Sequence, residues 1–192
     1  QQPIQLSPWQ STMVSFSPDK YPQLKLRHPP IWWPAEMGSH PLETLTVRFD
    51  SNGHVSDSAA ARVGIRETAA RLTGKGVRQI LINRKPILIR GGGWSQDLML
   101  RQDHEQLPEQ IRMVKDLHLN TIRLEGKLEG DAFFRLTDEN GILVMAGWCC
   151  CDQWELWSKW TPENYRVAAD SLRSQMLRLR HHASIFVWLN GS

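Results

Sequence analysis

The sequence predicts an α/β plus β protein, in which a β part comes first and alternating strands and helices follow. Three observations lead to this fold class. Apolar residues alternate with period two through residues 42–49, whereas from Val77 onward short apolar runs alternate with segments of helical periodicity. The composition, with 41% hydrophobic and 22% charged residues in a chain of 192, is that of an ordinary folded protein. It excludes a disordered, collagen-like or disulfide-dense chain.

The β part contains three candidate strands. Ser11–Phe16 alternates weakly and Leu42–Phe49 alternates clearly. A third runs from about His54 to Glu67, after the turn sequence Asn52-Gly53. An immunoglobulin-type sandwich needs about seven strands, so three or four are too few to close one. We therefore expect either an irregular domain or further strands upstream of residue 1.

The second part begins with a hairpin pattern. Two apolar runs, Val77–Ile82 and Pro86–Arg90, flank Asn83-Arg84-Lys85, and Gly91-Gly92-Gly93 is expected to end the second run. Helical and strand patterns then alternate along the chain. The expected helices are 106–117, 131–140 (with Gly141 as its stop) and 162–180, and the expected strands are 120–125, 142–146 and 184–189. The side chains expected to face inward from the last helix are Val167, Leu172, Met176 and Leu179.

This order, β-α-β-α-β-α-β, is typical of a parallel sheet built from βαβ units. Four such strands form either half of an eight-stranded barrel or one wing of a Rossmann sheet. The sequence lacks the phosphate-binding pattern G-x-G-x-x-G, because no third glycine follows Gly91-Gly92-Gly93 at the required place. A barrel is therefore favoured. Because the sequence stops on a buried-looking strand, at Asn190-Gly191-Ser192, we expect it to be incomplete.

Charge and motif content argue against several functional classes. The net charge of +3 comes from 23 basic and 20 acidic residues dispersed along the chain, so no basic block points to nucleic acid. The longest apolar runs, such as 142–146, are far short of a membrane span, and residues 1–5 lack a signal-peptide pattern. The adjacent Cys149, Cys150 and Cys151 suit neither a mutual disulfide nor a zinc site. We expect no metal and no cofactor, and the cysteines leave the redox compartment open.

Carboxylates and tryptophans are interleaved on the segments that follow the expected parallel strands. In barrel enzymes such segments, here 90–101, 125–131, 147–160 and 190–192, carry the chemistry. The side chains they collect are Trp94, Asp97, Glu125, Lys127, Glu129, Trp148, Asp152, Trp154, Glu155, Trp157 and Trp160. Acids bind hydroxyl or amino groups and indoles stack on sugar rings, which suits a carbohydrate; the alternative is a rim of salt bridges and packing aromatics. Glu125 either neutralises a cationic amine of a substrate or pairs with Arg123 or Lys127.

Several long motifs resemble one known family. They are Trp32–Gly38 followed by Val63–Arg66, then Ile87–Trp94 with Asp97-Leu98 and Leu100-Arg101, then Asn120–Gly126, then Gly147-Trp148 with Cys150–Asp152 and Trp154-Glu155. In this order they resemble glycoside hydrolase family 2, and within it the exo-β-D-glucosaminidases that act on chitosan. The resemblance extends from about Ser7 to Ser192. Cys149 departs from the acidic or polar residue of some relatives.

The resemblance implies a fold and a mechanism. Residues 1–72 would be the C-terminal part of an immunoglobulin-like β-sandwich, and residues 73–192 the first four strands, the N-terminal half, of a TIM (β/α)8 barrel. Members of the family retain anomeric configuration with two carboxyl groups about 5–5.5 Å apart. The resemblance places the acid/base Asp directly after Ser192 and the nucleophile further on. Neither is in the sequence, so the chain alone is expected to be inactive.

The resemblance also implies how a substrate is bound. Glu125 matches the residue that holds the 2-amino group of glucosamine, and Ser192 stands where most relatives carry Asn. Asp97 lines the same pocket by position. The expected substrate-binding set is Trp94, Asp97, Glu125, Trp148, Asp152, Glu155 and Ser192, with Trp94 or Trp148 as a stacking platform. Expected partners are a glucosamine-containing oligosaccharide and companion polypeptide fragments that complete the barrel. The expected location is secreted or a lytic compartment.

Two other functions stay open at this point. One is a non-catalytic carbohydrate-binding or structural chain that keeps the scaffold without the catalytic carboxylates. The other is a β-mannosidase-like or β-galactosidase-like enzyme of the same family. Ser192 argues against the second alternative, since those relatives carry Asn there.

Overall fold

The computed structural model of the protein describes residues 1–101, 105–124, 126–148 and 156–189. Its strands are β1 (Glu43–Ser51), β2 (His54–Val63), β3 (Thr68–Leu72), β4 (Arg78–Ile82), β5 (Lys85–Ile87), β6 (Gly91–Trp94), β7 (Thr121–Leu124), β8 (Leu143–Gly147) and β9 (Ile185–Leu189). Its helices are α1 (Gln106–Asp116), α2 (Asp131–Asn140) and α3 (Pro162–Leu179), with 3-10 turns η1 (Pro22–Leu24) and η3 (Trp157–Lys159).

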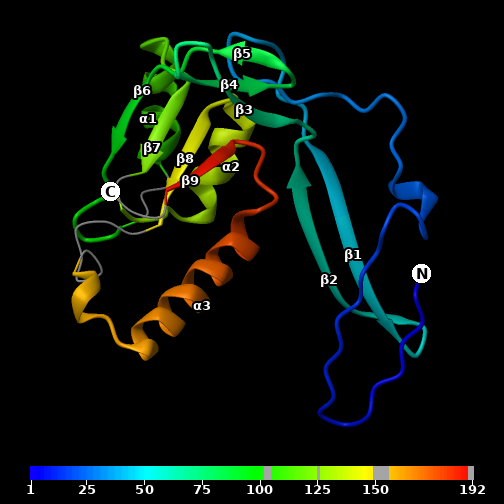
Figure 1. The fold of residues 1–192 in the computed structure, drawn as a ribbon. Helices are drawn as coiled ribbons and strands as arrows, with labels where there is room; N and C mark the ends of the chain where they lie inside the picture. Colours follow the sequence, from blue (N-terminus) through cyan, green and yellow to red (C-terminus); the bar gives the residue numbers. More distant parts are fainter. Residues whose placement is uncertain (102–104, 125, 149–155, 190–192) are drawn as a thin grey trace.

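The C-terminal part is a four-stranded parallel sheet in the order β6-β7-β8-β9. Each of α1, α2 and α3 connects one of these strands to the next (Figure 1). This confirms the predicted β-α-β-α-β-α-β order. Local signals set the helix ends: Thr161 caps α3 in a capping box with Asn164, and Gly141 ends α2 in the left-handed region at φ 67°.

The first parallel strand differs from the prediction. Gly91–Trp94 is itself β6, whereas 88–90 lie outside any strand and Lys85–Ile87 is β5, antiparallel to β4. The expectation that the glycines end a strand was therefore wrong. Gly91 pairs with Thr121, and a Cβ on Gly91 would lie 2.0 Å from the Thr121 carbonyl oxygen. Glycine is needed because two backbones approach closely at this point.

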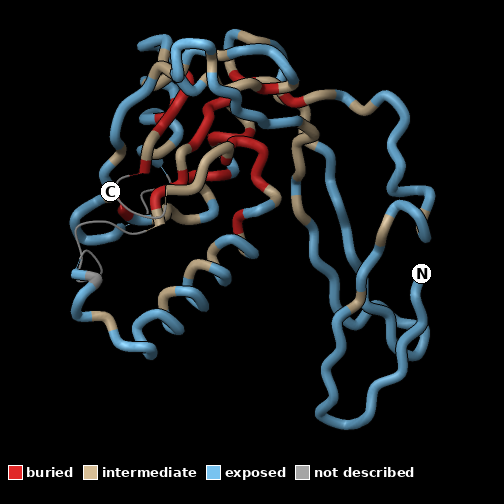
Figure 2. Tube along the Cα trace, viewed as in Figure 1, coloured by how far each residue is buried: buried red, intermediate tan, exposed pale blue. Residues whose placement is uncertain are grey.

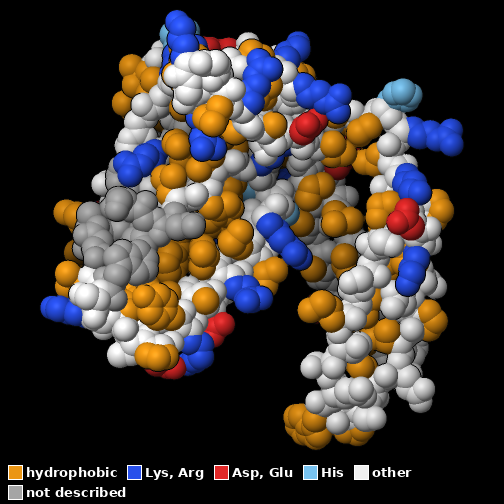
Figure 3. Space-filling model, viewed as in Figure 1, with side chains coloured by type: hydrophobic (Ala, Val, Ile, Leu, Met, Phe, Trp, Pro, Cys, Tyr) orange, Lys and Arg blue, Asp and Glu red, His pale blue; other side chains and the backbone are white. Residues whose placement is uncertain are grey.

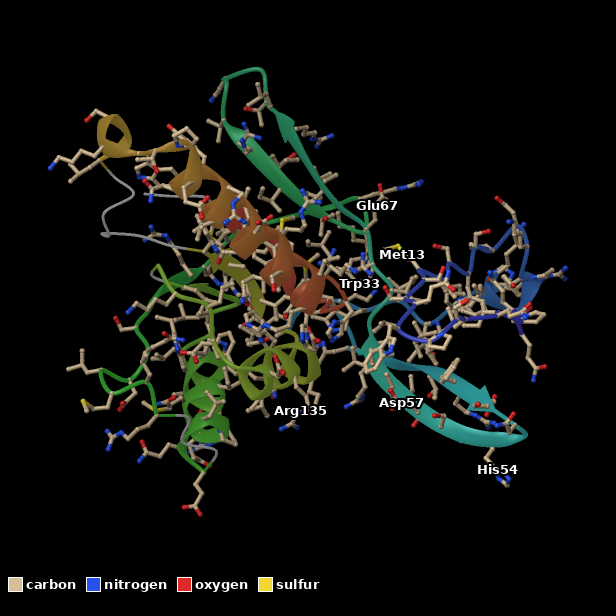
Figure 4. The ribbon with its side chains drawn as sticks, turned by 90° about the horizontal axis from the view of Figure 1, so that it is seen from below. Met13, Trp33, His54, Asp57, Glu67 and Arg135 are labelled. Carbon is tan, nitrogen blue, oxygen red and sulfur yellow. The ribbon has the colours of Figure 1, made fainter. Side chains whose placement is uncertain are left out.

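Two antiparallel sheets precede the parallel one. β1 and β2 form a ribbon joined at Asn52 (φ 51°) and Gly53 (φ 78°), the turn chemistry that the sequence predicted. The ribbon projects away from the layered part, with His54 at its tip (Figure 4). β3, β4 and β5 form the second sheet, and β3 escaped prediction because its sequence, Thr-Ala-Ala-Arg-Leu, has no clear alternation.

The expected strand at 11–16 was wrong, since no strand forms there. The sheet β3-β4-β5 contains residues on both sides of position 72, and the division of the chain at that position stays a prediction. Within the described ranges no helix is long and apolar enough to cross a membrane.

Two apolar clusters hold the layered part together, and the buried stretches gather there (Figure 2). The larger one packs α1 and α2 against the sheet through residues such as Ile111, Phe133, Phe134 and Val144. The smaller one joins Trp32, Ile82, Leu143 and Ala183. Burying an aromatic or aliphatic side chain of this size contributes about 1.5–3 kcal/mol.

Trp32 connects the segment before the ribbon to the parallel sheet. Its side chain is fully buried, and its indole N–H donates to the carbonyl oxygen of Asp138 on α2 at 2.9 Å. The Trp32 carbonyl accepts from the side chain of Asn83 at 3.0 Å. A Cβ on Gly64 would meet Ala183 Cβ at 2.5 Å, so the 63–66 motif also packs tightly on the residues before β9. The two quoted motifs thus form one junction.

Helix α3 is less covered than its sequence predicts. Leu179 is fully buried, but Val167 is 52% exposed and Met176 41% exposed, so the expectation that these two face inward was wrong. On the face shown in Figure 3, hydrophobic side chains gather over the layered part and recur along the ribbon. The helix therefore packs on the sheet chiefly through its C-terminal end.

Candidate functional site at the carboxyl ends of the parallel strands

The four parallel strands end at one edge of their sheet, at Trp94, Leu124, Gly147 and Leu189. Trp148 directly follows β8, and its backbone N–H donates to the Leu189 carbonyl at 3.1 Å. The ends of β8 and β9 are thereby fixed side by side. In open and closed α/β sheets, this edge is where loops position ligand-binding residues.

Three residues of the predicted set lie in the described part of the chain: Trp94, Asp97 and Trp148. The other four, Glu125, Asp152, Glu155 and Ser192, lie outside the described residues. The neighbours of Glu125 in sequence, Leu124 and Gly126, are both buried.

Trp94 is partly buried at the end of β6. Its indole Nε1–H donates to a carboxylate oxygen of Glu129 at 2.9 Å. Its ring packs at a tilt against Phe133 of α2, with ring centroids 5.2 Å apart. An aromatic side chain held in this way has a fixed orientation and an apolar face, which suits both packing and sugar stacking.

Asp97 is tied to Arg101 four residues later. The Asp97 carboxylate accepts from Arg101 Nη2 at 2.7 Å and from Nε at 3.1 Å, and also from the backbone N–H of Met99. These hydrogen bonds, that of the Arg101 side chain first, lower the pKa of Asp97 to about 2. The ion pair is therefore intact above pH 4 and is lost as the pH falls toward 2. Asp97 organises its own loop through these bonds.

A pocket of about 320 Å³ opens beside these two residues. Its lining combines an aromatic face with amide and carboxylate groups, from Trp94, Asp97, Gln106, Gln110, Glu129 and Phe133. A second hollow lies next to it and is lined in part by Lys127, Glu129, Trp148 and Arg178. Glu129 lines both, so it lies between the surroundings of Trp94 and those of Trp148. Such a mixture of indoles and polar groups is suited to carbohydrate hydroxyl groups.

Glu129 belongs to a predicted loop but not to the predicted binding set. Nothing in its local sequence signals the bond to Trp94, 35 positions away. The pairing of β6 with β7 brings the two segments together in the folded sheet. Within the described ranges, no three His, Cys, Asp or Glu side chains gather so as to hold a metal ion.

Comparison with known proteins shows which proteins are similar to this chain. No protein-family model matches it. The exo-β-D-glucosaminidase of Streptomyces avermitilis is 41% identical over 196 residues, which cover 98% of this chain and 22% of that protein. The exo-β-D-glucosaminidase of Hypocrea jecorina is 34% identical and covers 100% of this chain and 22% of its own length. The crystal structure of the exo-chitosanase CsxA of Amycolatopsis orientalis matches with a TM-score of 0.80 at 39% identity, over 85% of this chain and 20% of that one.

The chain is therefore similar to one segment of these relatives, whose names are those of glycoside hydrolases. More particularly, it is similar to the exo-β-D-glucosaminidases, the branch of family 2 that its motifs resemble, and the comparisons confirm that resemblance. It spans about a fifth of the length of these relatives.

Proposed function

We propose that this chain is part of the catalytic core of a retaining exo-β-D-glucosaminidase that removes glucosamine from the non-reducing ends of chitosan oligomers. In this proposal residues 1–72 belong to an immunoglobulin-like sandwich and residues 73–192 form half of a TIM barrel. The observation that carries it is the adjacency of β6, β7 and β8 in a sheet whose strands end at Trp94, Leu124 and Gly147. In the sequence, Glu125 directly follows Leu124 and Trp148 directly follows Gly147. The similarity to glucosaminidases supports the substrate class. CsxA, moreover, has been crystallised with PNP-β-D-glucosamine.

The proposed roles follow from charge. Glucosamine carries an ammonium group at neutral pH, and a carboxylate at position 125 neutralises it. Ser192 leaves room beside the 2-amino group, and Trp94 or Trp148 stacks on the sugar ring. Asp152 and Glu155 add polar contacts from the loop after β8.

Catalysis in this proposal needs two carboxyl groups beyond residue 192. The acid/base protonates the leaving oxygen while the nucleophile attacks the anomeric carbon and forms a covalent glycosyl-enzyme. Water then hydrolyses this intermediate, with the acid/base now accepting a proton. The remaining parts of the barrel complete the site, and a secreted or lytic location is part of the proposal.

Replacing Glu125 with Gln in the whole protein tests the substrate assignment. We expect KM for a β-glucosaminide to rise about tenfold to hundredfold, because a hydrogen bond to a charged group contributes about 1.5–3 kcal/mol. KM for the matching β-glucoside, which lacks the amine, should change by less than threefold. Steady-state kinetics on both substrates measure this difference.

Glu163→Gln is the matched control, since Glu163 is exposed on α3 and pairs with Arg166. It should leave both KM values unchanged. Equal effects of Glu125→Gln on the two substrates would contradict recognition of the amine. Sugar binding without any hydrolysis by the unmodified protein would indicate the non-catalytic alternative.

A further inference from the structure

The bond between Glu129 and Trp94 links the loops that follow β6 and β7. A second bond runs parallel to it, because Gln96 Nε2 donates to the Leu128 carbonyl at 2.7 Å. One bond starts at the last residue of β6 and the other two residues after it, and both end on the segment that follows β7. The relative position of the two loops is thus fixed by side chains as well as by strand pairing.

The backbone of the second loop is also held from α3. Arg178 Nη2 donates to the Glu129 carbonyl at 3.2 Å, and Arg178 pairs with Asp131 at the start of α2. Arg178 also lies over the ring of Phe134 at 6.0 Å. The bond from Arg178 thus holds the backbone of Glu129 in place, and from this backbone the carboxylate of Glu129 reaches the indole of Trp94.

The indole of Trp94 packs against the larger apolar cluster, and two of its contacts bear most directly on its orientation. One is the tilted contact with the ring of Phe133, which is apolar and does not by itself select one orientation of the indole N–H. The other is the hydrogen bond to Glu129, which is directional and charge-assisted. The carboxylate thus selects one orientation of a ring that lines the pocket.

We propose that Glu129 is a positioning residue for sugar binding, acting through Trp94: its carboxylate holds the indole in the orientation in which the ring faces the pocket. This inference rests on the proposed function for the identity of the sugar. It differs from the role proposed for Glu125, because the Glu129 carboxylate acts as a hydrogen-bond acceptor for the indole and need not carry a charge toward the substrate.

Glu129→Ala and Glu129→Gln in the whole protein separate positioning from direct charge recognition. Glu129→Ala should raise KM for a β-glucosaminide about tenfold, with kcat within twofold. Glu129→Gln keeps a carbonyl oxygen that can accept from the indole, so its KM should stay within threefold of the unmodified protein. If Glu129 bound the ammonium directly, Gln would be as harmful as Ala, and the proposal would be overturned.

A double-mutant cycle tests whether Glu129 acts through Trp94. Trp94→Phe removes the indole donor, so Glu129→Ala should have no further effect on KM in that background. If the two substitutions instead raised KM independently, so that their factors multiplied in the double variant, the proposal would be contradicted. Glu109→Gln is the control, because Glu109 is an exposed residue of α1 paired with Arg112, and it should leave KM unchanged.

A spectroscopic readout keeps this inference separate from the proposed function. The indole N–H resonance of Trp94, assigned by its loss in Trp94→Phe, should shift in Glu129→Ala whether or not the protein hydrolyses a glucosaminide. An unshifted resonance overturns the positioning role. A shifted resonance, together with an unmodified protein that hydrolyses no glucosaminide, supports the Trp94–Glu129 link and overturns only the proposed function.

Discussion

Replacing Asp138 with alanine is expected to lower the free energy of unfolding by about 3–5 kcal/mol, because it removes the acceptor of two buried hydrogen bonds and a negative charge that interacts with the partly buried Arg66. Asp138 lies on α2 and is buried. Its Oδ1 accepts from the backbone N–H of Ser184 at 2.8 Å, and its Oδ2 lies 2.7 Å from Nδ1 of the buried His182. A carboxylate only accepts, so Nδ1 carries the proton of this bond.

The negative charge of Asp138 also interacts favourably with the guanidinium of Arg66, a residue of the 63–66 motif. Burial lowers the pKa of Arg66, and the charge of Asp138 opposes that shift. Arg66 in turn donates to the carbonyl of Ala183, which precedes β9, and to that of Ile185, the first residue of β9. Removing the carboxylate leaves two buried donors unpaired and a partly buried cation uncompensated, which explains the size of the expected loss.

Urea unfolding of Asp138→Ala beside Glu139→Ala measures the effect. Glu139 is the next residue, and it pairs with Arg62 and Arg135 near the surface. Its replacement should cost no more than about 1 kcal/mol. Asp138→Asn, which keeps one acceptor oxygen, should fall between the two. If Asp138→Ala were no less stable than Glu139→Ala, the buried network would not hold α2 to β9.

Replacing Gly147 with alanine is expected to cost about 3 kcal/mol of stability, the upper end for overpacking a core. A Cβ at this position would lie 2.1 Å from the Leu124 carbonyl oxygen and 3.2 Å from the Gly126 backbone nitrogen. Both atoms belong to the main chain and cannot rotate away, so β7 and β8 must separate at their carboxyl ends. The added methyl group therefore acts at the carboxyl ends of β7 and β8, directly before Trp148.

The matched control is Gly92→Ala in β6 of the same sheet, where a Cβ would meet nothing within 4 Å. It should change stability by less than about 1 kcal/mol. Thermal unfolding of the two variants gives the comparison. In the whole protein, Gly147→Ala should also lower kcat/KM about a hundredfold, as expected for an ångström-scale displacement of binding groups. Equal stability of the two variants would show that the strands can absorb the methyl group.

Sequence reasoning succeeded where the signal was local. The helical spacing of 131–140 and the left-handed Gly141 fixed α2, and Asn52-Gly53 fixed the turn of the ribbon. It failed at Gly91–Gly93. Glycines usually interrupt a strand, but here Gly91 lies in a strand because the neighbouring backbone comes too close for a side chain, and this contact is visible only in the folded sheet. It also failed at Val167 and Met176, because periodicity shows that a helix has an apolar face but not how much of that face is covered.

The candidate site shows the same division. The places of Trp94, Asp97 and Trp148, at or after the carboxyl ends of β6 and β8, could be predicted from the order of strands and helices. That they bind a substrate stays a prediction. Two contacts could not be predicted from the sequence: the hydrogen bond from Trp94 to Glu129 and the ion pair of Asp97 with Arg101. Each depends on the direction of a side chain, which only the folded structure shows. The network of Arg66, Asp138 and His182 joins three distant parts of the sequence, and no spacing rule connects them.

The most direct test of the account is the anomeric configuration of the first glucosamine that the whole protein releases from a chitosan oligomer. Proton NMR during the first minutes of hydrolysis distinguishes the two anomers before they equilibrate. We predict β-glucosamine, released from the non-reducing end, as a retaining two-carboxylate mechanism requires. Initial release of the α-anomer, or no release of glucosamine at all, would contradict the assignment.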